Sequence, residues 1–177
     1  MQMPEPDQQI IARRESICAA LGKLVPADSM VASEEGRRAY DADGLSAYRQ
    51  LPLAVVLPET VEQLAAVMKF CHAEGIKVVP RGAGTSLSGG ALPLADAVLV
   101  GLGKFNRILD IDYANRCVVA QPGVTNLSIT HAVAAAAVSS NPTKSARCVA
   151  GFCKIRKVTS LTIPKSPSDP VITPIKS

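Results

Sequence analysis

The chain has 177 residues, of which 47% are hydrophobic and 19% charged, a composition typical of a folded globular protein and not of a disordered one. Aromatic residues make up 3% and Trp is absent, so the stacked aromatic surfaces that bind single-stranded nucleic acid are not expected. Residues 1–137 carry twelve Lys/Arg and fourteen Asp/Glu, whereas residues 138–177 carry seven basic residues and one acidic one. The overall charge of +4 therefore comes from the last forty residues, and the charge of residues 1–137 gives no reason to expect a nucleic-acid partner.

The N-terminal third contains one helical pattern and a polar segment. Apolar residues at Ile10, Ile17, Cys18 and Leu21, followed by Gly22, predict a helix over 10–21. Residues 28–51 are polar and irregular, and we expect the rest of the chain to hold them. We therefore take 1–52 as an N-terminal helix with an extended lead-in.

A strand, a helix and a second strand follow. The apolar run 54–57 predicts a buried strand, and Thr60 with Gln63 forms a T-x-x-Q capping box at the start of a helix that ends at Gly75. Residues 77–80 supply the next strand. Because this is a strand–helix–strand unit of about thirty residues, its two strands should be parallel.

The next elements follow a glycine-rich segment. Strands are predicted over 97–101, 107–111 and 116–120, and an alanine-rich helix over 124–137. Thr125 or Asn126 can cap this helix. The expected fold class is mixed α+β, with a small mixed sheet flanked by the two helices that begin near residues 60 and 124.

The composition changes near residue 138. The last forty residues hold five of the thirteen prolines, and Pro164, Pro167, Pro170 and Pro174 recur at a spacing that prevents a helix. Residues 138–177 therefore have the composition of a disordered tail or linker.

Several classes of site and location are disfavoured. No stretch approaches the roughly 20 apolar residues of a membrane-spanning helix, and the N-terminus has no signal-peptide pattern. We expect a cytoplasmic protein, with any association with the inner membrane made through partner subunits. No CxxC pair is present, so no metal site is predicted, and Cys18, Cys71 and Cys117 are expected to be buried thiols.

Residues 80–92 contain the segment that most strongly indicates a function. Four glycines in the nine residues 82–90 allow tight turns, and their N–H groups, with the hydroxyls of Thr85 and Ser86, suit phosphate oxygens. A P-loop is excluded because Gly90 and Ala91 occupy the positions of its Lys and Ser/Thr. A Rossmann fingerprint is excluded because no helix pattern follows. Two interpretations remain: a loop that binds the pyrophosphate of a dinucleotide, and an ordinary Gly-Ser surface loop.

Several segments in order resemble a known family. Residues 40–49, 52–58, the glycine-rich segment, 108–111 and 121–124 are similar to the FAD-linked subunit of bacterial glycolate oxidase and to FAD-dependent D-lactate dehydrogenases. These belong to the vanillyl-alcohol-oxidase-type (PCMH-type) flavoproteins. The resemblance runs from about Val31 to Ala137 and identifies 53–137 as the N-terminal, partial half of such an FAD-binding domain.

The resemblance implies a cofactor, a substrate class and a set of contacts. FAD is the expected cofactor, a 2-hydroxy acid such as glycolate or D-lactate the expected substrate, and other oxidase subunits are possible partners. The residues implied to contact FAD are Gly82, Ala83, Gly84, Thr85, Ser86, Gly90, Ala91, Pro122, Gly123 and Val124.

The resemblance also implies what the chain lacks. The substrate domain of relatives, with its acid/base histidine and metal ligands, has no counterpart, and His72 and His131 are expected to be surface or packing residues on helices. No catalytic residue is therefore assigned. The alternative to an active oxidoreductase is a catalytically inactive fragment that binds flavin weakly, with a tail derived from a frameshift or a fusion.

Overall fold

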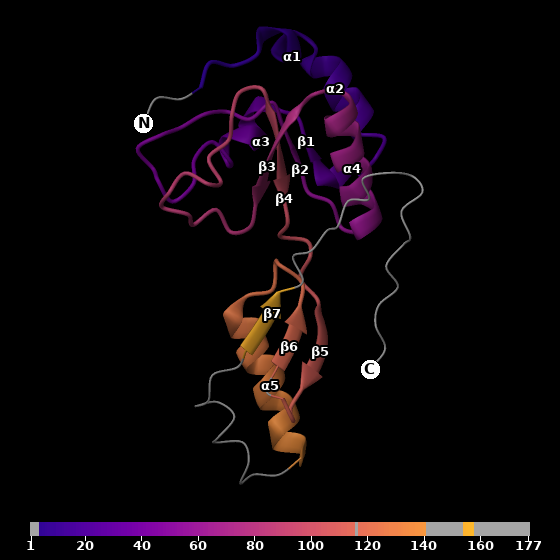
Figure 1. Ribbon diagram of the computed structural model, residues 1–177, viewed down its shortest axis with the longest axis vertical. Helices are drawn as coiled ribbons and strands as arrows, with labels where there is room; N and C mark the ends of the chain where they lie inside the picture. The colour runs from indigo at the N-terminus through magenta and orange to yellow at the C-terminus, as the bar shows by residue number, and fades with distance from the viewer. Residues whose placement is uncertain (1–3, 116, 141–153, 158–177) are drawn as a thin grey trace.

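The computed structural model describes residues 4–115, 117–140 and 154–157 (Figure 1). In chain order its elements are α1 Gln8–Ala12, α2 Arg14–Leu21, the 3-10 turn η1 Ala27–Ser29, β1 Met30–Val31, α3 Glu34–Arg38, β2 Ala54–Val56, α4 Val61–Ala73, β3 Lys77–Arg81, β4 Ala97–Gly101, β5 Ile108–Asp112, β6 Cys117–Ala120, α5 Asn126–Ser140 and β7 Lys154–Lys157. The mixed α+β class expected from the sequence is confirmed.

The first sheet has the strand order β1-β2-β4-β3. β4 is parallel to both β2 and β3, and the short β1 is antiparallel to β2. The two strands of the strand–helix–strand unit are therefore parallel, as predicted, but β4 lies between them. All residues of β2 and β4 are buried, which explains why these strands are unbroken apolar runs without alternation.

Helices α2 and α4 supply the core that covers this sheet. Ile17 and Leu21 of α2 and Val67 of α4 are at most 1% exposed, and they belong to one cluster with Val98 and Val100 of β4. Each fully buried side chain of this size stabilises the fold by about 1.5–3 kcal/mol.

The ends of α4 largely follow the prediction. The Thr60 hydroxyl accepts a hydrogen bond from Gln63 N at 3.3 Å, whereas the Gln63 side chain accepts from Glu59 N at 2.8 Å and not from Thr60. At the other end Gly75 has φ +67°, and Ile76 N donates to Cys71 O at 2.8 Å. This is a Schellman ending, and it aims the chain into β3.

The predicted helix over 10–21 is divided into two. Asp7 caps α1, so the helix begins at Gln8, and Arg13 interrupts it with φ −89° and ψ 6°. Arg13 N donates to Ile10 O, three residues back, which tightens the turn at the break.

The strands after β4 form a second sheet, where the sequence predicts a single small one. β5 is antiparallel to β6, and β6 is parallel to β7. Figure 1 shows this sheet and α5 in a different half of the molecule from β1–β4. Val118 and Ala120 of β6 pack with Val124 and Ile129, so α5 and the second sheet share a small core of their own.

The C-terminal expectations are only partly within the described residues. α5 continues to Ser140, and β7 lies inside the segment 138–177 for which the composition predicts no regular structure. The four residues of β7 include no proline, so each of them keeps its backbone N–H group. The remainder of that predicted tail lies outside the described residues. No helix in the described ranges is long and apolar enough to cross a membrane.

Asp96 ties the N-terminus to the first sheet. Its carboxylate is 2% exposed and accepts hydrogen bonds from Lys77 Nζ at 2.6 Å and from Asp7 N at 2.9 Å. Burial alone would raise the pKa of Asp96, but the hydrogen bonds from Lys77 and Asp7 outweigh it and hold that pKa below its ordinary value.

Replacing Asp96 with Asn should destabilise the fold by about 1–3 kcal/mol at neutral pH, because the neutral amide oxygen loses the ion pair with Lys77 and the charge-assisted hydrogen bonds that the carboxylate accepts. Since the folded-state pKa of Asp96 is lowered, its contribution is present above the unfolded pKa of about 4 and is lost as pH falls through the folded value. Urea unfolding of Asp96→Asn across this range, with the exposed Asp110→Asn as control, should therefore show a difference that shrinks in acid. A difference independent of pH would contradict this account.

Candidate functional site

The glycine-rich loop leaves the first sheet at the carboxyl end of its parallel strands. Arg81, the last residue of β3, pairs with Gly101, the last residue of β4, and Arg81 O accepts from Leu102 N at 2.8 Å. The loop after β3 and the connection after β4 therefore begin side by side. In open sheets of parallel strands this edge is where ligands bind.

The loop is built from two tight turns. Gly84 and Gly89 have φ +71° and +75°, a left-handed conformation that favours glycine. Leu92 N donates to Gly89 O at 3.2 Å, and Ser88 N donates to the Ser86 hydroxyl at 3.3 Å. Gly82, Ala83, Thr85 and Gly90 are exposed, whereas Ala91 and Leu92 are buried at the end of the loop.

The first half of the loop has unused hydrogen-bond donors. Within the described residues, the backbone N–H groups of residues 82–86 donate to no protein acceptor. Successive N–H groups in a turn form a concave site suited to phosphate oxygens. Five neighbouring donors without protein partners fit a pyrophosphate, as the dinucleotide interpretation requires.

Three of the other residues expected to contact FAD have backbone N–H groups that already donate to the protein. Ala91 N donates to the Asp43 carboxylate at 3.4 Å, Gly123 N to Phe105 O at 2.8 Å, and Val124 N to Gln121 O at 3.1 Å. Pro122 has no N–H group. The turn at 122–124 can therefore contact a ligand through its carbonyls or its surface, but not by donating backbone hydrogen bonds.

Arg81, the charged residue nearest the loop glycines, lies between the loop and the lead-in segment. Its Nη1 donates to Ala42 O at 2.7 Å and to Tyr40 O at 3.3 Å, and its guanidinium carbon lies 5.6 Å from the centre of the Tyr40 ring. These contacts attach the loop to the lead-in segment, and the Nη2 and Nε atoms of Arg81 lie against Gly84 of the loop.

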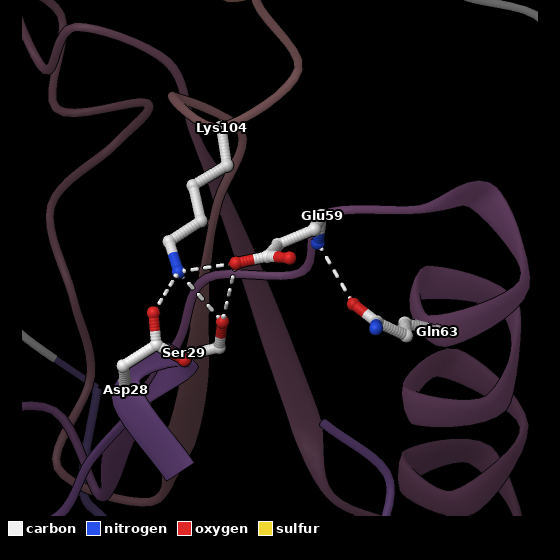
Figure 2. A network of polar contacts seen from close by, with 5 residues as sticks. All are labelled: Asp28, Ser29, Glu59, Gln63 and Lys104. Carbon is white, nitrogen blue, oxygen red and sulfur yellow. Dashed lines mark hydrogen bonds and ion pairs between the residues drawn. The ribbon is translucent and has the colours of Figure 1, made fainter. Parts of the chain in front are cut away.

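Lys104, on the connection after β4, is also engaged by the protein (Figure 2). Its Nζ lies 2.7 Å from Glu59 Oε1, 2.9 Å from Asp28 Oδ2 and 2.8 Å from the buried Ser29 hydroxyl. Hydrogen bonds to Glu59 and Asp28 raise the pKa of Lys104, and the same contact holds the pKa of Asp28 below its usual range. Lys104 is thus neutralised by carboxylates, whereas Arg81 keeps its charge beside Gly84. An anion at residues 82–86 would therefore meet neutral backbone donors with one guanidinium next to them.

Sequence reasoning missed the contribution of Asp43 and Gly44. Asp43 is buried, and its carboxylate accepts from Leu45 N at 2.9 Å as well as from Ala91 N. Gly44 lies against the loop, since a Cβ there would be 2.8 Å from both Thr85 O and Ser86 O. The available signal was an Asp-Gly pair in a polar segment that also carries the family resemblance.

Among the residues that the structure describes, the histidines and cysteines form no catalytic arrangement. His72 on α4 and His131 on α5 are exposed, as expected for surface residues. Cys71 is buried, and desolvation raises the pKa of its thiol to about 11, whereas Cys18 and Cys117 are only half-buried, so the prediction of burial is correct for Cys71 alone. The described residues contain no group of His, Cys, Asp or Glu that could hold a metal ion.

Comparison with known proteins identifies related sequences. A family model described as an FAD binding domain matches residues 52–153, beyond the point near Ala137 where the resemblance was expected to end. Glycolate oxidase subunit GlcD of Escherichia coli K12 is 49% identical over 121 residues, which are 68% of this chain and 24% of that protein. D-2-hydroxyglutarate dehydrogenase of Stutzerimonas stutzeri is 33% identical over 104 residues, covering 54% of this chain and 22% of that protein. The chain thus spans about a quarter of the length of these curated relatives.

Solved structures share the fold at lower identity. The 4-ethylphenol oxidase of Gulosibacter chungangensis superposes with a TM-score of 0.63 at 22% identity, over 76% of this chain and 26% of its own. Substrate-bound p-cresol methylhydroxylase gives 0.62 at 23% identity, over 74% and 26%. These likenesses confirm the expected PCMH-type fold.

Substitution of Gly123 tests whether the 122–124 turn packs directly against the backbone of residues 102–105. A Cβ at Gly123 would lie 2.7 Å from Leu102 O and 2.8 Å from both Gly103 O and Phe105 O, so backbone would have to move. Gly123→Ala should destabilise the chain by about 1–3 kcal/mol in thermal or urea unfolding, as overpacking does. Gly103→Ala, whose Cβ would meet nothing within 4 Å, is the control and should unfold as the unaltered chain does. Equal stability of the two variants would contradict the close packing of Gly123 against residues 102–105.

Proposed function

The chain belongs to the FAD-binding domain family, and we propose that it forms the part of a 2-hydroxy-acid oxidoreductase that holds the pyrophosphate of FAD. FAD is the cofactor of this family, and the relatives of the chain include glycolate oxidase subunits and D-2-hydroxyglutarate dehydrogenases. The observation that carries the proposal is the row of N–H groups at residues 82–86 that have no protein acceptor.

Each part of the loop has a proposed role. The N–H groups of Gly82, Ala83, Gly84, Thr85 and Ser86, with the two hydroxyls, bind the pyrophosphate oxygens. Gly90 and Ala91 form the far wall of the cradle, and Pro122, Gly123 and Val124 lie along the cofactor. Neutral donors suit a pyrophosphate diester, because each of its two phosphates carries one negative charge, whereas a terminal phosphate carries nearly two.

FAD supplies, when bound, a two-electron acceptor for the hydride on the hydroxyl-bearing carbon of the substrate. The residues of this chain bind and orient the cofactor, and none of them is proposed as the base that removes the hydroxyl proton. Glycolate or D-lactate is the proposed substrate of the whole protein, in line with what the names of the relatives state. Association with other oxidase subunits is part of the same proposal, and a cytoplasmic location stays a prediction.

A second candidate function is flavin binding without turnover. It is favoured by the exposed positions of His72 and His131 on α4 and α5, because a base must face the substrate carbon to act on it. The two candidates share the pyrophosphate site and differ only in catalysis.

Substituting Gly82 should separate binding from folding. A Cβ at Gly82 would meet nothing within 4 Å, so Gly82→Ala should fold normally, yet the methyl group would occupy space beside the free N–H groups. We expect FAD affinity, measured by the change in flavin fluorescence, to fall by about tenfold, equivalent to about 1.4 kcal/mol. Gly103→Ala, equally unobstructed, should leave the affinity unchanged.

The outcomes of this titration are distinct. Absence of FAD binding by the unaltered chain, or an unchanged affinity in Gly82→Ala, would contradict the proposed site. Glycolate and D-lactate assays with an artificial electron acceptor then distinguish the two functions: bound flavin without turnover supports the second candidate, and turnover would show that the chain supplies the catalytic groups itself.

A further inference from the structure

We propose that residues 40–45, named the strap, act as a positioning element that holds the glycine loop in its pyrophosphate-binding shape. This inference rests on the proposed function, because it assigns a role to residues that brace the same site. The strap precedes the segment that the family model matches, which begins at residue 52.

One end of the loop is attached to the strap through Arg81. The Arg81 guanidinium donates to the carbonyls of Tyr40 and Ala42 and lies over the Tyr40 ring. Arg81 is also the last residue of β3, so the strap is attached at the point where the loop leaves the sheet. The start of the loop is therefore fixed on both sides.

The other end of the loop is attached through Asp43. Its carboxylate accepts from Leu45 N at 2.9 Å within the strap and from Ala91 N at 3.4 Å in the loop, across 48 residues of sequence. Asp43 is 7% exposed, so solvent screens these contacts little. The free donors of residues 82–86 lie between the two attachments.

The middle of the loop is oriented by Gly44. The carbonyl oxygens of Thr85 and Ser86 lie against Gly44, close enough that a Cβ would be 2.8 Å from each. In a trans peptide the C=O and the following N–H point in opposite directions, and the chain has no cis peptides among its described residues. The N–H groups of Ser86 and Leu87 therefore point away from the strap. Because the carbonyls of Thr85 and Ser86 face the strap, the N–H groups that follow them face the opposite side of the loop, where we propose that the ligand binds.

Two variants perturb the strap by different means, and a third is a matched control. Asp43→Asn places an amide donor opposite one of the two N–H groups, and Gly44→Ala pushes the carbonyls of Thr85 and Ser86 away. Asp41→Asn makes the same chemical change within the strap, but at a side chain that makes none of the contacts with the loop: its carboxylate pairs with the exposed Arg49 at 3.5 Å. FAD and FMN affinities are measured by fluorescence at a temperature where circular dichroism shows every variant folded.

The expected result is a loss of FAD affinity of about tenfold in Asp43→Asn and in Gly44→Ala, and less than about twofold in Asp41→Asn. Affinity for FMN, which has one phosphate and no pyrophosphate, should stay as it is in the unaltered chain. Unchanged FAD affinity in the two strap variants, or an equal loss for FAD and FMN, would overturn the proposal, since the latter indicates a general loosening of the fold.

A measurement without flavin separates this inference from the proposed function. Amide relaxation by nuclear magnetic resonance should show lower order parameters for residues 82–86 in Asp43→Asn than in Asp41→Asn, with α4 unchanged in both. If the unaltered chain binds no FAD, the proposed function fails while this readout still tests the strap. If the order parameters of the loop are the same in both variants, the strap does not position the loop.

Discussion

The pairing of β3 with β4 in parallel register determines the position of the site. Because Arg81 pairs with Gly101, the glycine-rich loop and the connection that carries Lys104 leave the sheet at the same level. β2 ends at the same edge, since Val56 pairs with Val100, and Glu59 follows it within reach of Lys104. The buried apolar strands β2 and β4 thus hold in place three polar segments that are far apart in the sequence. A shift of β3 by one residue against β4 would move the glycine-rich loop relative to the other two segments and turn every side chain of β3 to the opposite face.

The electrostatics of this edge determine what kind of ligand it suits. Arg81 and Lys104 are the cations that a phosphate would be expected to attract, yet both are engaged, one by the carbonyls of the strap and the other by Asp28 and Glu59. The carboxylates neutralise Lys104, whereas the Arg81 guanidinium lies beside Gly84, next to the neutral backbone donors of residues 82–86. Such a surface binds by geometry, because each N–H must meet an oxygen, and it depends less on salt than a lysine-lined phosphate site would. The family match to an FAD binding domain agrees with this kind of recognition.

Local patterns in the sequence predicted most of the individual elements, but not their arrangement. The Thr60 cap, the Gly75 ending and the parallel strands follow from short-range rules, and the structure contains all three. The insertion of β4 between β2 and β3, and the division into two sheets, depend on long-range packing that no window of sequence carries. The same limit applies at the site. The glycine loop was found from its composition, whereas the roles of Asp43 and Gly44 follow from contacts with residues more than forty positions away. Likewise, only the structure shows that the N–H groups of Gly123 and Val124 are already paired.

The central claim is that the backbone N–H groups of residues 82–86 bind the pyrophosphate of FAD. The most direct test is a titration of the ¹⁵N-labelled chain with FAD, followed through the amide resonances of individual residues. The account predicts that the resonances of Gly82, Ala83, Gly84, Thr85 and Ser86 move together with FAD concentration, and that those of Gly123 and Val124 move less, because their N–H groups are already paired. Amide shifts located elsewhere, with residues 82–86 unaffected at saturating FAD, would contradict it.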